Sequence, residues 1–143
     1  MVAVETALSL AMESRAPLYL LHVLELPTGV DPMIGVVQPP LPEWREDSKR
    51  KLEALVPENW EADVRIEKEV LIGGPAISIA DFARQVNADM VVVGTHGRRG
   101  LQRLLMGSTA ETLLREAPIQ VLVVKQRVTT EELSEKASAV GAL

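Results

Sequence analysis

The hydrophobic pattern of the first 125 residues alternates between the spacing of helices and that of buried strands. Helical spacing predicts helices over residues 2–14, 43–56, 75–87 and 108–116. Apolar or alternating runs between them predict strands over residues 18–24, 63–73, 90–93 and 119–124. Largely apolar strands separated by helices are typical of a parallel sheet covered on both faces. The pattern therefore predicts one α/β domain over residues 1–125.

Three segments depart from the regular pattern. Apolar and charged residues alternate between Asp63 and Gly73, which predicts a half-exposed strand at the edge of the sheet. The stretch from Glu25 to Pro42 holds five prolines and two glycines, so we expect a long surface loop of the kind used as lids or partner contacts. Residues 126–143 form a C-terminal extension, which we expect to be a short helix with a frayed end.

Charge and composition exclude several classes of function. Fifteen Lys and Arg against twenty Asp and Glu give a formal net charge of −5, which is a poor match to nucleic acid or an anionic membrane. The chain has no cysteine, and its two histidines, His22 and His96, are not spaced as metal ligands. No apolar run approaches the length of a membrane span. We expect a soluble cytoplasmic protein without a metal centre, a nucleic-acid partner or a membrane partner.

One segment carries candidate chemistry. The strand over residues 90–93 leads into a glycine-containing loop, Gly94 to Gly97, and nine residues later Gly107 and Ser108 open a predicted helix. Glycines let backbone N–H groups approach an anion, and a helix start adds unpaired N–H donors and the positive end of the helix dipole. Strand, glycine loop and helix start therefore form a possible phosphate cradle.

Local charge supports an anionic ligand at this segment. No acidic residue lies between Met90 and Ala110, whereas Arg98, Arg99 and Arg103 place three positive charges there. This reversal of sign within an acidic chain favours a negatively charged ligand.

A purely structural interpretation of the same residues stays open. Ser108 and Glu111 match the S-x-x-E pattern of a helix capping box, and Gly94 and Gly97 fit a tight turn between strand and helix. Neither the Walker A pattern nor G-x-G-x-x-G is present, so the glycines alone do not decide between the two interpretations.

The segment resembles the ATP-binding branch of the universal stress protein family. The signature G-x2-G-x9-G-(S/T) of that branch is met by Gly94, Gly97, Gly107 and Ser108. The flanking stretches that also resemble the family are Leu21 to Val23, Gly73 to Ala76, Ala88 to Gly94 and Ala117 to Val124. The resemblance spans roughly residues 1–125. It implies an adenine nucleotide alpha-hydrolase-like fold, which is a three-layer α/β sandwich with a mostly parallel twisted sheet.

The resemblance also implies a ligand and the residues that bind it. The ligand would be ATP, with or without Mg²⁺, and no residue is assigned a catalytic role. The backbone of the loop Gly94 to Gly100 would hold ribose and phosphates, and His96 in that loop would have a backbone or positioning role. The residues at the helix start, Ser108 to Ala110, would hold the phosphate tail. Val23 would pack on adenine. The implied binding residues are Val23, Val93, Gly94, Thr95, His96, Gly97, Arg98, Arg99, Gly100, Gly107, Ser108, Thr109 and Ala110.

One family element is absent from the sequence. Members of the family begin with a strand whose tip carries an Asp near adenine and ribose, whereas this sequence starts with the helix that follows. That strand would lie between the strands over residues 18–24 and 90–93. Three arrangements would account for its absence. The natural chain begins upstream of Met1, the two flanking strands pair directly with each other, or a strand from a second chain lies between them. We favour the first arrangement because residues 2–12 show no N-cap of their own.

These observations lead to an expected function. We expect an ATP-binding stress-response or regulatory protein that acts as a nucleotide-dependent switch or dimer, with at most slow ATP hydrolysis. The homodimer would form through the strand over residues 119–124, because exposed apolar edge strands tend to pair. The alternative is a dimeric interaction module of the same family that does not bind nucleotide. An ATP pyrophosphatase is a weaker third hypothesis, because the Ser-Gly-Gly phosphate loop it needs is missing.

Overall fold

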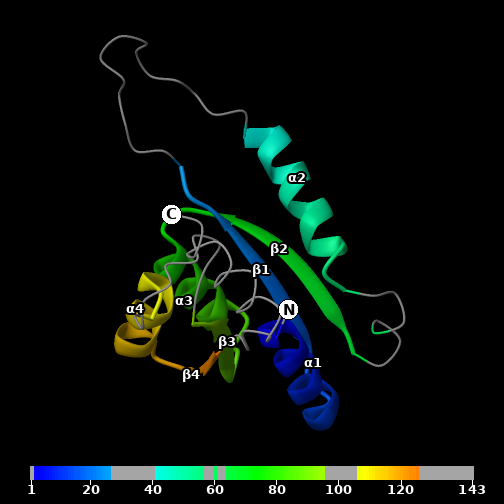
Figure 1. The fold of residues 1–143 in the computed structure, drawn as a ribbon, viewed down its shortest axis with the longest axis vertical. Helices are drawn as coiled ribbons and strands as arrows, with labels where there is room; N and C mark the ends of the chain where they lie inside the picture. Colours follow the sequence, from blue (N-terminus) through cyan, green and yellow to red (C-terminus); the bar gives the residue numbers. More distant parts are fainter. Residues whose placement is uncertain (1, 27–40, 57–59, 61–63, 96–105, 126–143) are drawn as a thin grey trace, which may run out of the picture.

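The alternation of helices and strands is confirmed by a computed structural model of the chain, which describes residues 2–26, 41–56, 60, 64–95 and 106–125. The elements are α1 (Val2–Ser14), β1 (Leu18–Leu24), α2 (Leu41–Glu53), β2 (Ile66–Ile72), α3 (Pro75–Gln85), β3 (Met90–Gly94), α4 (Ser108–Glu116) and β4 (Gln120–Val124) (Figure 1). The expected helix beyond residue 125 and most of the expected loop over 25–42 lie outside the described residues.

Element boundaries differ from the prediction in a few places. Helix α2 begins at Leu41, inside the segment expected to be loop, because a proline is tolerated in the first turn of a helix, where its missing N–H is not needed. The helix also ends at Glu53 rather than Val56. Strand β2 begins at Ile66 instead of Asp63, and α3 ends two residues before Asn87, whose φ of 51° is left-handed.

The elements form three layers. Tyr19 of β1 makes an edge-on ring contact with Phe82 of α3, whereas its neighbour Leu20 packs in a cluster with Leu52 of α2. Because successive strand residues point to opposite faces, α3 and α2 cover opposite faces of the sheet. Val4 of α1 packs on the Leu20 cluster, and α4 packs beside α3. The layers are therefore α1 and α2, the strands, and α3 and α4 (Figure 1).

The strands form two parallel pairs. Strand β1 pairs with β2 over its whole length, from Leu18 opposite Ile66 to Leu24 opposite Ile72. Strand β3 pairs with β4, from Met90 opposite Gln120 to Gly94 opposite Val124. Within the described residues the order is β1–β2 in one sheet and β3–β4 in the other. The predicted edge position of β2 is confirmed, and the arrangement in which β1 and β3 close up on one another is wrong.

Two clusters of buried hydrophobic residues lie on one side of the molecule, and further buried side chains, among them Leu113 and Ala110 of α4, lie on the other. One cluster joins Leu20, Leu52, Val56 and Val70, and a second joins Leu8, Ala11 and Val64. Both clusters belong to the region of α1, α2, β1 and β2. In contrast, Val91 to Val93 of β3 are only half-buried. No helix among the described residues has the length and apolar character required to cross a membrane.

Candidate functional site

The end of β3 is tied to the start of α4 by two backbone hydrogen bonds. The N–H of Thr95 donates to the carbonyl of Val124 at 3.0 Å, which extends the β3–β4 pairing beyond Gly94. The carbonyl of Thr95 accepts the N–H of Gly107 at 2.7 Å. Thr95 and Gly107, which are twelve positions apart in the sequence, are therefore direct neighbours. This contact fixes the amino end of α4 beside the carboxyl end of β3.

The first turn of α4 has no side-chain cap. Its N-cap is Gly107, with extended backbone angles of φ −60° and ψ 144°, and the Gly107 carbonyl accepts the N–H of Glu111 at 3.0 Å. Ser108 is therefore the first helical residue rather than the cap. The capping-box interpretation of Ser108 and Glu111 is wrong because it requires the serine to occupy the N-cap position.

The uncapped helix start presents several hydrogen-bond donors. The N–H groups of the first turn, on Ser108, Thr109 and Ala110, have no carbonyl partner within an α-helix. The Ser108 side chain is exposed, while Ala110 is 2% exposed and anchors the turn in the core. Glu111 places one negative charge in the same turn. Backbone donors and a hydroxyl at the positive end of a helix are suited to bind an anion.

Only some of the expected site residues are brought together. Val93 and Gly94 lie opposite Val123 and Val124 at the end of β3, close to the start of α4. Val23 lies near the end of β1 opposite Leu71 and belongs to the other strand pair. The expected loop residues outside the described part of the chain are His96, Gly97, Arg98, Arg99 and Gly100.

The structure adds Val124 to the candidate site. Its carbonyl holds Thr95, and through Thr95 it sets the position of Gly107. Sequence reasoning missed it because a backbone acceptor can belong to almost any residue type and leaves no signal in the side-chain pattern.

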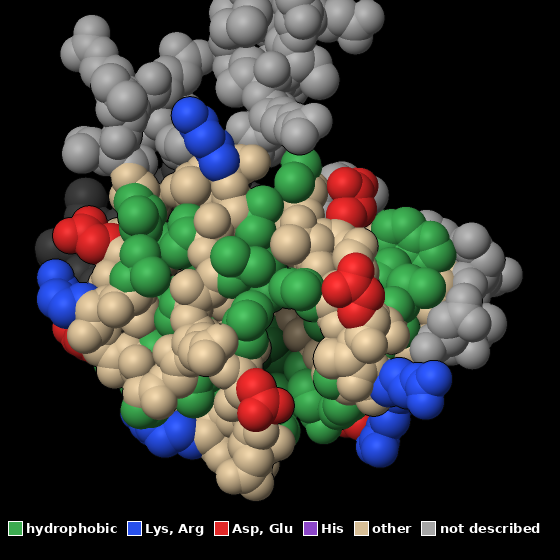
Figure 2. Space-filling model, turned by 90° about the horizontal axis from the view of Figure 1, so that it is seen from below, with side chains coloured by type: hydrophobic (Ala, Val, Ile, Leu, Met, Phe, Trp, Pro, Cys, Tyr) green, Lys and Arg blue, Asp and Glu red, His purple; other side chains and the backbone are tan. Residues whose placement is uncertain are grey.

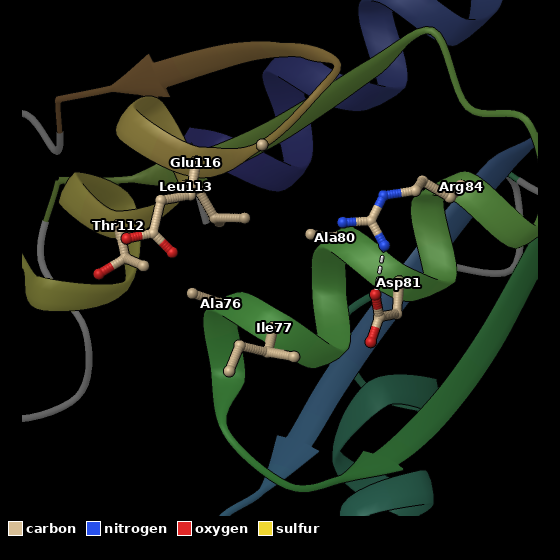
Figure 3. Close-up of a pocket in the computed structure, with 9 residues that line it drawn as sticks. Ala76, Ile77, Ala80, Asp81, Arg84, Thr112, Leu113 and Glu116 are labelled. Carbon is tan, nitrogen blue, oxygen red and sulfur yellow. Dashed lines mark hydrogen bonds and ion pairs between the residues drawn. The ribbon is translucent and has the colours of Figure 1, made fainter.

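A separate cavity of about 110 Å³ lies between α3 and α4 (Figure 3). Its lining includes Ala76, Ile77 and Ala80 of α3 with Leu113 of α4, and none of the expected site residues. This volume is below the roughly 300 Å³ at which typical ligand pockets begin. Among the described residues, no group of three or more His, Cys, Asp or Glu side chains could hold a metal ion.

Parallel strands with helices on both faces, and a helix start held against a strand end, define an α/β protein with a parallel sheet between two helical layers. The sequence model of the universal stress protein family matches residues 1–125 of this chain. The chain belongs to the universal stress protein family.

Individual relatives agree with this assignment. The chain is 34% identical over 132 residues to universal stress protein MJ0531 of Methanocaldococcus jannaschii, covering 87% of this chain and 74% of that protein. The solved structure of UspA from Lactobacillus plantarum superposes with a TM-score of 0.68 at 25% identity, covering 86% and 87% of the two chains. A universal stress protein in complex with cAMP has the same fold, with a TM-score of 0.59 at 23% identity and coverage of 86% and 84%.

Proposed function

We propose that this protein is an ATP-binding regulatory member of the universal stress protein family, in which bound nucleotide changes the conformation or the dimer. The observation that carries the proposal is the uncapped start of α4, held at the end of β3 by the Gly107–Thr95 hydrogen bond. A relative solved in complex with cAMP supports an adenine nucleotide as the ligand. We propose that the site binds ATP, and we propose no hydrolysis of ATP there.

The described residues would act on different parts of the ligand. The first-turn N–H groups and the Ser108 hydroxyl would donate to phosphate oxygens, which the helix dipole favours. Gly94 has no side chain, so backbone and ligand can approach closely at the end of β3. Val23 would offer an apolar surface to the base. Mg²⁺, where it accompanies ATP, would be held by phosphate oxygens and water.

The dimer part of the proposal rests on β4. Because Thr95 donates to Val124, residues of even number in β4 direct their backbone groups toward β3. Val121 and Val123 therefore direct theirs toward the outer edge, where no described strand pairs. An apolar edge of this kind can pair with the same edge of a second copy. We propose a homodimer through residues 119–124.

Calorimetric titration of Mg-ATP into the full chain, compared with Gly107→Val, tests nucleotide binding. The extended backbone angles of Gly107 suit valine, so the variant should fold, while its branched side chain crowds the first-turn donors. Gly74→Val is the matched control. Gly74 is also a glycine N-cap with extended angles, and nothing lies within 4 Å of an added Cβ.

The expected result is saturable binding to the original chain and to Gly74→Val, and loss of binding in Gly107→Val. Equal binding by all three proteins would place the ligand elsewhere and overturn the role of α4. Absence of binding to the original chain would overturn the proposed ligand.

A second candidate is a dimeric interaction module that does not bind nucleotide. The observation that favours it is that Val23 and Gly94, two expected contacts, belong to strand pairs that share no strand pairing within the described residues. The same titration separates the candidates, because the module would dimerise without binding Mg-ATP.

A further inference from the structure

A groove of about 470 Å³ lies where α1 ends and where β1 and β2 begin. It opens to the surface, and its volume lies within the roughly 300–1,000 Å³ of typical ligand pockets. None of the expected nucleotide contacts lines it. We call it the arginine groove, and its lining residues are Met12, Arg15, Ala16, Pro17, Val64 and Arg65.

The backbone brings the two arginines of the groove to one place. Leu18, the first residue of β1, donates its N–H to the carbonyl of Arg65 at 2.9 Å, and Ala11 of α1 packs in a buried cluster with Val64. Arg15 and Arg65 therefore start from neighbouring stretches of backbone. The amino ends of β1 and β2 lie at the bottom of Figure 1. Figure 2 shows the molecule from that side, with hydrophobic side chains exposed between charged ones.

Arg15 occupies a backbone position that favours glycine. Its φ is 53°, and its N–H donates to the carbonyl of Met12 at the end of α1. Helix α3 ends in the same way at Asn87, whose φ is 51° and whose N–H donates to Arg84. Glycine and asparagine adopt this left-handed conformation readily, whereas arginine does so at a cost in stability. A ligand for the Arg15 guanidinium would account for an arginine at this position.

Both guanidinium groups of the groove are accessible to a ligand. Arg15 and Arg65 are exposed, and Arg15 forms no ion pair with any residue that the structure describes. Arg65 Nη2 lies 2.6 Å from Glu67 Oε1, but a guanidinium has five N–H donors, so this contact leaves others for a ligand. The lining carries two positive charges and no acidic residue, within a chain of net charge −5. The groove therefore favours an anionic group.

The rest of the lining is apolar. Met12 is 48% exposed although it is hydrophobic, Pro17 is also exposed, and Val64 is buried beneath them. An inorganic anion would contact the arginines and leave this apolar surface in water. An apolar chain with an acid group at one end would contact both parts of the lining, and burying its methylenes would add to the binding free energy.

We propose that the arginine groove binds a small organic acid with an apolar chain. The carboxylate pairs with Arg15 and Arg65, because a guanidinium matches the geometry of a carboxylate with two parallel hydrogen bonds. The chain lies on Met12, Pro17 and Val64. This site is additional to the proposed nucleotide site, since it shares no residue with the end of β3 or the start of α4.

Titration of decanoate into the full chain without nucleotide, followed by NMR and kept below the micelle concentration, tests this proposal. Amide shifts should appear at Arg15, Ala16, Val64 and Arg65, and Gly107 should not shift. Each buried methylene strengthens binding up to about fourfold, so decanoate should bind about tenfold or more tightly than hexanoate. Decanol has the same chain without the charge and should bind about fivefold or more weakly than decanoate.

Arg15→Gly separates loss of the ligand from loss of the fold. Glycine suits the left-handed position, so the variant should unfold about 2–4 °C higher than the original chain. It should nevertheless bind decanoate about fivefold or more weakly, because one guanidinium is gone. Asn87→Gly is the matched control, since it changes the same kind of helix end outside the groove and should leave decanoate binding unchanged. Arg65→Gln should weaken binding as Arg15→Gly does.

Several outcomes would overturn the proposal. They are undiminished decanoate binding by Arg15→Gly, an equal loss in Asn87→Gly, and equal affinities for decanol and decanoate. Amide shifts centred outside the groove would place the acid elsewhere in the molecule. Inorganic phosphate that binds as tightly as decanoate would show that the arginines take a simple anion and that the apolar lining has no part in binding.

Discussion

At the scale of single residues, the neighbours Leu113 and Leu114 of α4 offer a matched pair. Leu113 is 1% exposed, whereas Leu114 is 48% exposed. Leu113→Ala leaves a cavity in the core and should lower the free energy of unfolding by about 2–4 kcal/mol. Leu114→Ala removes little buried surface and should change it by about 0.5 kcal/mol or less. Urea denaturation of both variants measures the difference, and equal losses would contradict the packing of α4.

The turn after β2 gives a second residue-scale prediction. Gly73 has a φ of 138°, and an added Cβ would lie 2.9 Å from the Ser78 hydroxyl. Gly73→Ala should therefore lower the free energy of unfolding by about 1–3 kcal/mol. Gly74→Ala is the control, because Gly74 has extended angles and open space around an added Cβ. Thermal unfolding compares the variants, and a Gly73→Ala protein as stable as the control would contradict the strain.

The sequence could predict residue types at the candidate site better than their geometry. Gly107 and Ser108 are correctly placed at the start of α4, because glycine and small polar residues favour helix starts. Which of the two is the cap was not predictable, since Ser108 with Glu111 also satisfies the capping pattern. The hydrogen bond from Gly107 to Thr95 joins backbone atoms across an intervening loop, and such a contact has no sequence signal.

At the scale of elements, the edge of β4 yields a prediction for the proposed dimer. The N–H of Val123 faces the outer edge, so Val123→Pro should keep the β3–β4 pairing and remove an intermolecular hydrogen bond. Light scattering at micromolar concentration should then give a monomer mass for the variant and a dimer mass for the original chain. A dimer mass for Val123→Pro would contradict the proposed interface.

Leu122→Pro is the matched control for this edge. Its N–H faces β3, so the substitution breaks a hydrogen bond inside the β3–β4 pair. We expect Leu122→Pro to lower the thermal unfolding temperature far more than Val123→Pro. Comparable losses in the two variants would show that the edges of β4 are assigned incorrectly.

The same alternation explains how much of the fold was predictable. The apolar runs of β1 and β3 mark buried strands because burial on both faces leaves a continuous hydrophobic signal. The start of α2 was predicted wrongly because prolines near Leu41 are equally typical of a loop and of the first turn of a helix. Strand pairing is a property of backbone edges, which side-chain patterns do not record, so the pairing of β1 with β2 and of β3 with β4 could not be predicted from the sequence.

At the scale of the whole molecule, the proposed nucleotide would contact both strand pairs. Gly94 ends β3, in the β3–β4 pair, whereas Val23 lies near the end of β1, in the β1–β2 pair. No strand pairing joins the two pairs within the described residues, while α1 packs against strands of both. A ligand that contacts both pairs would add to the interactions that hold them together.

Mg-ATP should therefore stabilise the fold as a whole. A ligand that binds only the folded protein raises the free energy of unfolding, by about 2.7 kcal/mol when its concentration is a hundred times its Kd. Thermal unfolding with and without Mg-ATP measures the shift, and Gly107→Val, whose side chain crowds the first turn of α4, should show a much smaller one. An equal shift in Gly107→Val would contradict binding at the start of α4, and no shift in the original chain would contradict nucleotide binding itself.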